Sequence, residues 1–267
     1  MSGRFSGPAE NGLPNGERHI LMDAALRSLL DWYAEMGVDV PKVPAARPVR
    51  TAKSVPKMQS SDPAPAASVA ATADATADLS KIKTLDALHA ALNAFDAGSL
   101  SDGARQVVFS RGNPEANLMV IGESPGRDED IQGKPFVGPS GQLLDRMLGA
   151  IALGAEDFYV TNVMNWHLPK NRNPKPAEIE ICRPFIEKHI ELAQPKVLLL
   201  VGGLSMSALT GLTGIMKNHG QWQEVTIAGK TYPALPLYHP AFLLRRPELK
   251  KDAWRDLLSL RETLLSL

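Results

Sequence analysis

The apolar run at residues 118–121, with the loop that follows it, constrains the fold of this chain more than any other segment. A continuous apolar run bounded by turn residues predicts a strand buried on both faces, as in a parallel sheet. The run ends at Gly122, Glu123 follows directly, and Gly126 lies three residues further on. Folds of the α/β type place a carboxylate at the mouth of a pocket in this way, because glycines allow a ligand to approach the backbone closely.

Helical and extended patterns alternate along the rest of the chain. Alternation of this kind predicts an α/β fold, a three-layer α/β/α sandwich with a central, mostly parallel sheet. The carboxyl ends of parallel strands share one edge, so Glu123, Asn162 and His239 should meet there. The expected helices are 82–95, 141–153, 176–194, 204–209 and 250–265, and the expected strands are 158–162, 196–201, 225–227, 230–232 and 234–238.

Composition divides the chain into four parts. Residues 1–19 are rich in Gly, Pro and Asn, and we expect them to be disordered. Residues 20–37 have an amphipathic helical pattern that either packs on the core or binds a partner. Residues 38–79 are rich in Pro, Ala and Ser and predict a flexible linker. Residues 80–267 should form a single α/β domain.

The overall composition limits the compartment and the kind of partner. The chain has 267 residues, one cysteine, no net charge and a pI near 7.0. A single cysteine excludes an internal disulfide and is typical of a reducing cytoplasm. Neither a secretion signal nor a run of the ~20 apolar residues of a membrane span is present, so we expect a cytoplasmic protein, and a monomer. Neutral charge argues against binding nucleic acid over a wide basic surface.

Two later segments show the same pattern, in which an apolar strand ends in polar residues. Residues 158–163 read Phe-Tyr-Val-Thr-Asn-Val, with Asn162 at the strand end. Residues 235–240 end in His239-Pro240 and lead into a basic loop. Phe136 follows a proline and offers a flat face for a planar ring. A carboxylate, an amide, an imidazole and an aromatic face together suit chemistry on a nucleobase.

With these pieces the chain resembles the uracil-DNA glycosylase superfamily, and most closely its family 4, the iron–sulfur type. The blocks of that family are Gly-Glu-x-Pro-Gly, Glu-Asp-x-x-Gly-x-Pro-Phe-Val-Gly, Thr-Asn-Val and His-Pro, and all of them occur here in this order within residues 105–260. Several motifs in the right order are specific where one would be weak. The resemblance implies a uracil-DNA glycosylase-like catalytic domain that hydrolyses the N-glycosidic bond of uracil in DNA to start base-excision repair.

Two alternatives remain open at the level of sequence. One is a non-catalytic nucleobase- or nucleic-acid-binding protein that keeps the fold, and the other is a glycosylase for another deaminated base. The retained acid, amide and imidazole argue against the first. An Arg-rich insertion that supplies a nucleophilic His elsewhere in the superfamily is not found after residue 163, which favours simple hydrolysis.

The resemblance implies two catalytic residues. Glu123 would orient or activate water and favour the cationic sugar, where the plain alternative is a solvated surface Glu. His239 would donate a hydrogen bond to the uracil carbonyl as negative charge develops, where the alternative is an ordinary strand-end His. Asp128, Glu129 and Asp130 are further acids that suggest a solvated loop or a shared water-handling role.

The resemblance also implies the residues that bind the base. Asn162 would read the uracil edge, because its amide offers a donor and an acceptor. Phe136 would stack on the base, with an ordinary core Phe as the alternative. The amides of Gly122 and Gly126 would contact the base or a phosphate.

The segment after His239 resembles the loop by which the family enters DNA. Leu243 or Leu244 would fill the gap left by the flipped base, and Arg245 and Arg246 would bind phosphates. The alternative is a helix that packs on the core. Further positive charge nearby comes from Lys250, Lys251 and Arg255.

One departure from the family concerns its cofactor. Family 4 holds an iron–sulfur cluster with four cysteines, and Cys182 matches only the last ligand position. The third position falls at Trp166 and the first two fall within 95–98, where no cysteine occurs. We therefore expect no cofactor, and a region packed by side chains such as Phe95 and Trp166. Cys182 would be a small buried hydrophobe rather than a reactive thiol.

Overall fold

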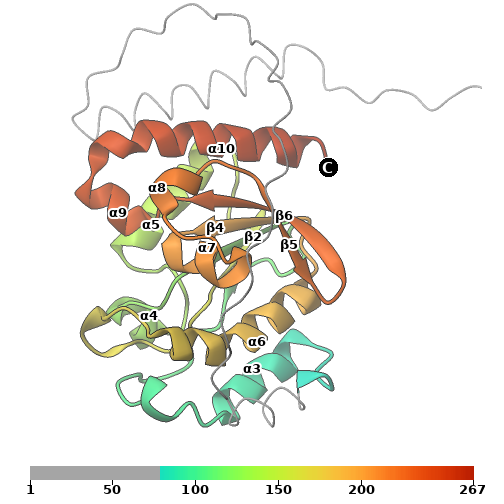
Figure 1. Cartoon of the computed structure of the whole chain (residues 1–267), viewed down its shortest axis with the longest axis vertical. Coiled ribbons are helices and arrows are strands. Elements are labelled where there is room, and N and C mark those ends of the chain that lie inside the picture. Colours follow the sequence, from blue (N-terminus) through green and yellow to red (C-terminus); the bar gives the residue numbers. More distant parts are fainter. Residues whose placement is uncertain (1–78) are drawn as a thin grey trace, which may run out of the picture.

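A single sheet is the centre of the fold, and the computed structural model describes residues 79–267 around it (Figure 1). The expected segments 1–19 and 20–37 lie outside the described residues, as do residues 38–78 of the expected linker 38–79. Leu79, the last residue of the expected linker, is buried. The strands lie in the order β1 (Arg111–Gly112), β3 (Phe158–Asn162), β2 (Leu118–Gly122), β4 (Val197–Val201), β6 (Lys230–Leu237) and β5 (Gln223–Ile227).

The four inner strands are parallel, and β1 and β5 are antiparallel at the two edges. Every residue of β2, β3 and β4 is buried, which confirms the fully buried strands that the apolar runs predict. Gly122 pairs with Asn162, and Val201 pairs with Leu237. The carboxyl ends of the four parallel strands therefore lie at one edge of the sheet.

Helices cover both faces of the sheet and complete the expected α/β/α sandwich. In Figure 1, α10 (Lys250–Leu265) crosses above the strands, and α6 (Pro176–Ala193) lies below them. Helices α5 (Pro139–Ala150) and α9 (Pro240–Arg245) share the face of α10, and α7 (Gly203–Thr210) shares the face of α6. The remaining helices are α3 (Leu85–Ala94), which packs against α6, α4 (Arg127–Gln132), α8 (Ile215–Asn218) and the short 3-10 turns Gly98–Leu100, Pro169–Asn171 and Pro247–Leu249.

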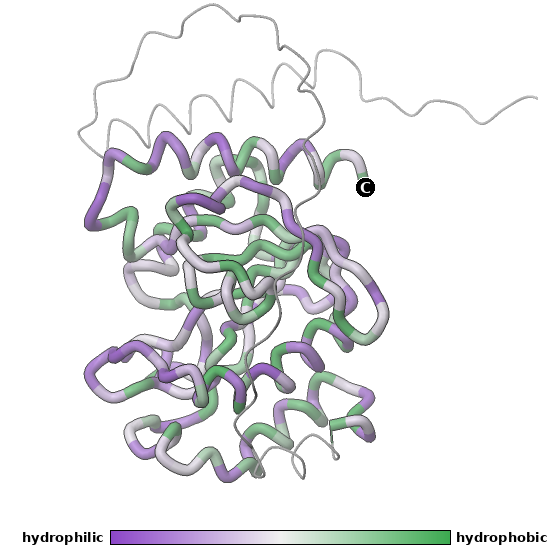
Figure 2. The backbone as a smooth tube through the Cα atoms, viewed as in Figure 1, coloured by the Kyte–Doolittle hydropathy of each residue, from purple (hydrophilic) through white to green (hydrophobic). Residues whose placement is uncertain are grey.

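Alternation along each strand divides the core into two layers. Leu118 and Val120 of β2 face α5 and α10, whereas Met119 and Ile121 face α6 and α7. This follows from the period of two in an extended chain. Figure 2 shows the hydrophobic residues running through the strands, with polar residues on the outer helices. Within residues 79–267, none of the helices has the length and apolar composition needed to cross a membrane.

Three segments differ from the sequence expectation. The two strands expected at 230–232 and 234–238 form one continuous strand, β6, because the fixed φ of Pro233 fits an extended chain even though it lacks a donor. The acidic loop at 128–130 lies within helix α4, and the loop expected after His239 is helix α9.

The glycines of α5 give a matched test of this packing. A Cβ at Gly141 would overlap the backbone carbonyl of Phe136, whereas a Cβ at Gly149 would meet nothing within 4 Å. We expect Gly141→Ala to lower the free energy of unfolding by about 2–4 kcal/mol, as overpacking against backbone does. Gly149→Ala should raise it by about 0.5–1 kcal/mol, because Ala favours a helix. Urea denaturation measures both, and equal effects would contradict the packing of this turn.

Candidate active site at the carboxyl edge of the sheet

A cavity of about 870 Å³ opens at the carboxyl edge of the parallel strands. Glu123, Asn162 and His239, which are far apart in sequence, all line it. The sequence therefore predicts correctly that the ends of β2, β3 and β6 meet. Phe136, Gly126 and Arg245 also line the cavity, together with Gly202 and Gly203 after β4.

The carboxylate of Glu123 is held by the first turn of α7. Its Oε1 accepts a hydrogen bond from the backbone N–H of Leu204 at 3.0 Å. A carboxylate is favoured at this end of a helix, where free N–H groups carry partial positive charge. Gly202 has φ 105°, and a Cβ there would overlap the Glu123 carboxylate. The glycine after β4 therefore makes room for the acid after β2.

Gly122 brings the amide and the aromatic ring of the site together. A Cβ at this position would overlap both the Oδ1 of Asn162 and the ring of Phe136. Phe136 is 5% exposed and has φ 55°, a left-handed conformation that is costly for a side chain of this size. It belongs to the core on one side and lines the cavity on the other. Phe136 is thus a core residue that also lines the cavity, and its stacking on a base stays a prediction.

The imidazole of His239 has a defined proton arrangement. Its Nδ1 is 3.2 Å from the backbone N–H of Ala241 and must accept that hydrogen. Burial lowers the pKa of His239, and the charge of Arg245 lowers it further, while Glu123 and Glu129 oppose the shift. The ring is therefore neutral, with its proton on Nε2. Phe136 stacks beside it with ring centroids 5.7 Å apart.

Two of the three neighbouring acids are buried, which corrects the expectation of a solvated loop. Glu129 Oε1 accepts hydrogen bonds from the N–H groups of Val137 at 3.0 Å and Gly138 at 2.9 Å. Asp130 accepts one from the N–H of Arg105 at 2.8 Å. Glu129 thus holds the turn that carries the aromatic ring of the site. Sequence reasoning missed this role because the partners of Glu129 are backbone groups, which leave no mark in the sequence.

Asp128 differs from these two residues. It is exposed and lines the cavity. Glu129 lines the same cavity but is buried, so Asp128 is the exposed acid of α4 that shares this space with Glu123.

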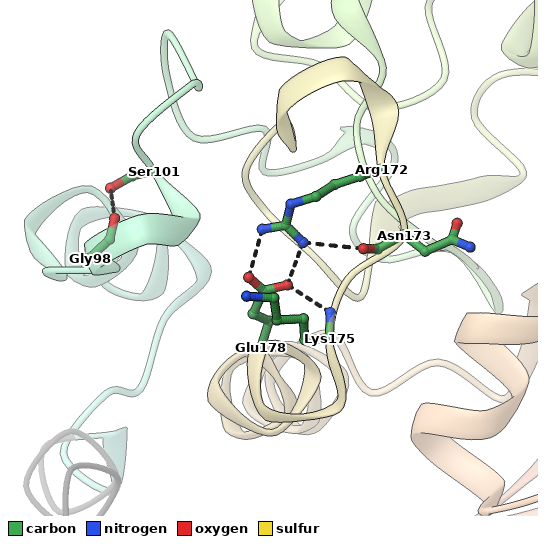
Figure 3. Close-up of polar contacts among 6 residues, drawn as sticks. All are labelled: Gly98, Ser101, Arg172, Asn173, Lys175 and Glu178. Carbon is green, nitrogen blue, oxygen red and sulfur yellow. Dashed lines mark hydrogen bonds and ion pairs between the residues drawn. The ribbon is translucent and has the colours of Figure 1, made fainter.

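One rim of the cavity is fixed by an ion pair (Figure 3). The guanidinium of Arg172 donates two hydrogen bonds to Glu178, at 2.7 and 2.6 Å, and the N–H of Lys175 donates a third at 2.7 Å. The hydrogen bonds from Arg172 lower the pKa of Glu178 from 4.5 to about 2, against the opposing effect of burial. The loop at 171–174, which lines the cavity, is thereby anchored to the first turn of α6.

The four residues after His239 that we expect to bind DNA differ in their exposure and contacts. Leu243 is 0% exposed and packs in the core, so it has no surface for DNA and the expectation for it is corrected. Leu244 is 43% exposed. Arg245 lines the cavity, whereas Arg246 pairs with Glu248 at 2.6 Å. These differences arise because the segment forms helix α9, in which neighbouring residues face different directions.

Three further histidines have packed or hydrogen-bonded positions. His189 is buried beside the hydroxyl of Tyr159, and burial lowers its pKa to about 3. His219 pairs with Asp256 at 2.7 Å. His167 does not line the cavity, but its Nδ1 donates to the carbonyl oxygen of Pro125, which does, at 3.0 Å.

The residues present do not fit a metal or an iron–sulfur cluster. Within residues 79–267, no group of three or more His, Cys, Asp or Glu side chains could hold a metal ion. Cys182 is completely buried, and burial raises the pKa of its thiol to about 12. A thiol of this kind stays protonated and is a poor ligand.

Comparison with known proteins agrees with this geometry. Residues 109–258 match the model of the uracil DNA glycosylase superfamily. The chain is similar to a type-4 uracil-DNA glycosylase of Archaeoglobus fulgidus, with 39% identity over 54% of this chain and 75% of that protein. Proteins of the same description match from Saccharolobus solfataricus, with 36% identity over 61% and 78%, and from Pyrobaculum aerophilum, with 33% identity over 65% and 91%.

The Arg172–Glu178 pair predicts a pH dependence of stability. Because the pKa of Glu178 is lowered from 4.5 to about 2, its contribution is complete above pH 4.5 and is lost as the pH falls toward 2. Glu178→Gln should cost about 2 kcal/mol near neutral pH, as expected for hydrogen bonds to a charged group, and less as the pH falls through this window. Urea denaturation across that range measures it. A constant difference between the two proteins would contradict the assignment.

Proposed function

The chain belongs to the uracil DNA glycosylase superfamily, and from this premise we propose that it hydrolyses the N-glycosidic bond of uracil in DNA to start base-excision repair. The observation that carries the proposal is the meeting of Glu123, Asn162 and His239 around one cavity at the strand ends. The relatives described above, which the chain covers over three quarters or more of their length, are named as type-4 uracil-DNA glycosylases.

The reaction needs a different group on each side of the bond that breaks. The sugar gains cationic character, the base leaves with negative charge, and the target nucleotide must leave the base stack to reach the protein. A carboxylate beside the sugar and a donor beside the base meet these needs. Glu123 and His239 supply them from neighbouring parts of the same cavity.

Glu123 acts on the sugar side. Its carboxylate orients the attacking water and stabilises the positive sugar, and the hydrogen bond from the N–H of Leu204 fixes its direction. General-base assistance of this kind is worth about 10²–10⁴ in rate. The covalent route through a histidine nucleophile is not needed.

His239 acts on the base side. Because Nδ1 accepts the N–H of Ala241, the hydrogen on Nε2 remains for the uracil oxygen that becomes negative. A neutral imidazole can donate this hydrogen bond to the departing uracil without transferring its proton to it.

Asn162 selects the base, and Phe136 supports it. The amide of Asn162 offers one donor and one acceptor, which matches the alternating carbonyl and N–H groups of uracil. Cytosine has the opposite pattern at this edge and would leave buried groups unpaired. The ring of Phe136 provides a face against which the extruded base packs.

Binding of DNA relies on a short contact around one nucleotide. Leu244 is the exposed apolar side chain of α9, and Arg245 beside it lines the cavity. An apolar side chain inserted into the stack fills the gap left by the flipped base. A protein without net charge can bind DNA in this way, because the contact needs positive charge only beside the flipped nucleotide.

Uracil excision by matched variants tests the reaction. The protein is incubated with a labelled oligonucleotide that carries one uracil, and strand breaks are read after alkali. Glu123→Gln should lower kcat by about 10²–10⁴, the value of a lost general base. Asp128→Asn, which changes an exposed acid of the same cavity, should lower it by less than about fivefold, within the range of an indirect charge effect. Absence of breaks with the unmodified protein would refute the proposal and favour a binding protein or another base. Equal losses would show that Asp128 shares the role and would contradict its assignment to Glu123 alone.

A second comparison tests whether Leu244 acts as a wedge, that is, whether its side chain inserts into the base stack of DNA. Leu244→Ala should lower kcat/KM for double-stranded DNA by about 5- to 20-fold and for single-stranded DNA by less than about threefold, because only the duplex has a gap to fill. Leu265→Ala is the control, since Leu265 is 77% exposed at the end of α10. Equal effects of Leu244→Ala on both substrates would contradict the wedge.

A further inference from the structure

The segment 163–168, directly after β3, joins the catalytic loop to a separate hydrophobic cluster. On one side its backbone and side chains bind the loop that carries Glu123. The N–H of Val163 donates to Gly122 and the N–H of Met164 donates to Glu123, both at 3.0 Å. Nδ1 of His167 donates to the carbonyl oxygen of Pro125, also at 3.0 Å.

On its other side the segment is anchored by alternate residues. Met164, Trp166 and Leu168 are each 4% exposed or less, and all three belong to one hydrophobic cluster between α3 and α6. Asn165, between them, exchanges two hydrogen bonds with Val108, at 2.8 and 3.1 Å. The alternation is that of an extended chain with one face in the core. The position of the catalytic loop therefore depends on this cluster.

Three aromatic rings pack together in this cluster, with Phe95 half-buried at its edge. The ring of Phe95 lies 4.9 Å from the ring of Phe185, edge to face, and 6.1 Å from the ring of Trp166. We call these three residues the ring cluster. Pairs of rings in such geometry contribute about 0.5–1.5 kcal/mol beyond the area they bury. Cys182 of α6 completes the same cluster as a protonated, completely buried thiol.

This composition disagrees with the metal group that the family resemblance implies. The positions that would supply the first three cysteine ligands hold Phe95 and its neighbours and Trp166, and these side chains fill the space with carbon. A single protonated thiol among rings cannot hold a cluster that needs four thiolates.

We propose that the ring cluster supports residues 163–168 and thereby holds the Glu123 loop in place without any metal. Trp166 is then a positioning residue, because it acts on Glu123 only through the three hydrogen bonds of its own segment. This proposal deepens the proposed function and rests on it for the role of the loop, but the packing itself can be tested without substrate.

The first test measures metal content and its effect on stability. The full chain, produced in iron-supplemented cells and purified without oxygen, should contain far less than one iron atom per chain and show no visible absorption of an iron–sulfur cluster. Treatment with an iron chelator should leave Tm unchanged. Stoichiometric iron, or a Tm that falls with the chelator, would overturn the proposal.

The second test asks whether Trp166 positions the loop or only stabilises the fold. In Trp166→Leu, amide hydrogen exchange of residues 122–126 and 163–168 should accelerate by about tenfold or more, as for a locally opened segment. Trp166→Phe, which keeps a ring, should restore most of the protection. Phe158→Leu is the matched control, because Phe158 is a buried aromatic residue (3% exposed) at the opposite end of β3.

The outcomes separate the two roles. Faster exchange of residues 122–126 in Trp166→Leu, but not in Phe158→Leu at a similar loss of Tm, supports the proposal. Unchanged exchange there, or the same change in both variants, overturns it. Neither measurement requires uracil, so failure here would leave the proposed reaction standing, and failure of uracil release would leave the packing result standing.

Discussion

The parallel pairing of β3, β2, β4 and β6 is the constraint on which the rest of the molecule depends. It brings four strand ends to one edge, with Gly122 opposite Asn162 and the turn after β4 beside Glu123. Since the backbone ladder fixes the register, a one-residue slip would turn each of these side chains to the other face of the sheet. The geometry of the site therefore depends on the register of the strands as well as on the identity of its residues.

Much of this arrangement follows from the sequence, and what does not has identifiable physical reasons. Apolar runs predict the buried strands, and the polar residue that ends each run predicts which side chains meet. The burial of Glu129 could not be predicted, because its partners are the backbone N–H groups of Val137 and Gly138. The burial of Leu243 and the exposure of Leu244 could not be predicted either, because they depend on the direction of a short helix that the sequence suggests only weakly.

Charge in this protein acts locally. The chain has no net charge, and several cations are already paired, among them Arg172 with Glu178 and Arg246 with Glu248. The polar groups that line the cavity include the Glu123 carboxylate at a helix terminus, the neutral ring of His239 and the side chain of Arg245. Groups that are fixed in a protein cavity interact more strongly than in bulk water, because electrostatic interactions there are less screened.

The most direct test of the account is the crystal structure of the Glu123→Gln protein with a short uracil-containing DNA strand. The account predicts the uracil inside the cavity, its face against Phe136, its edge facing the amide of Asn162, and a carbonyl oxygen within hydrogen-bond distance of His239 Nε2. A base bound outside the cavity, or an Nε2 atom of His239 that faces away from the uracil, would contradict it.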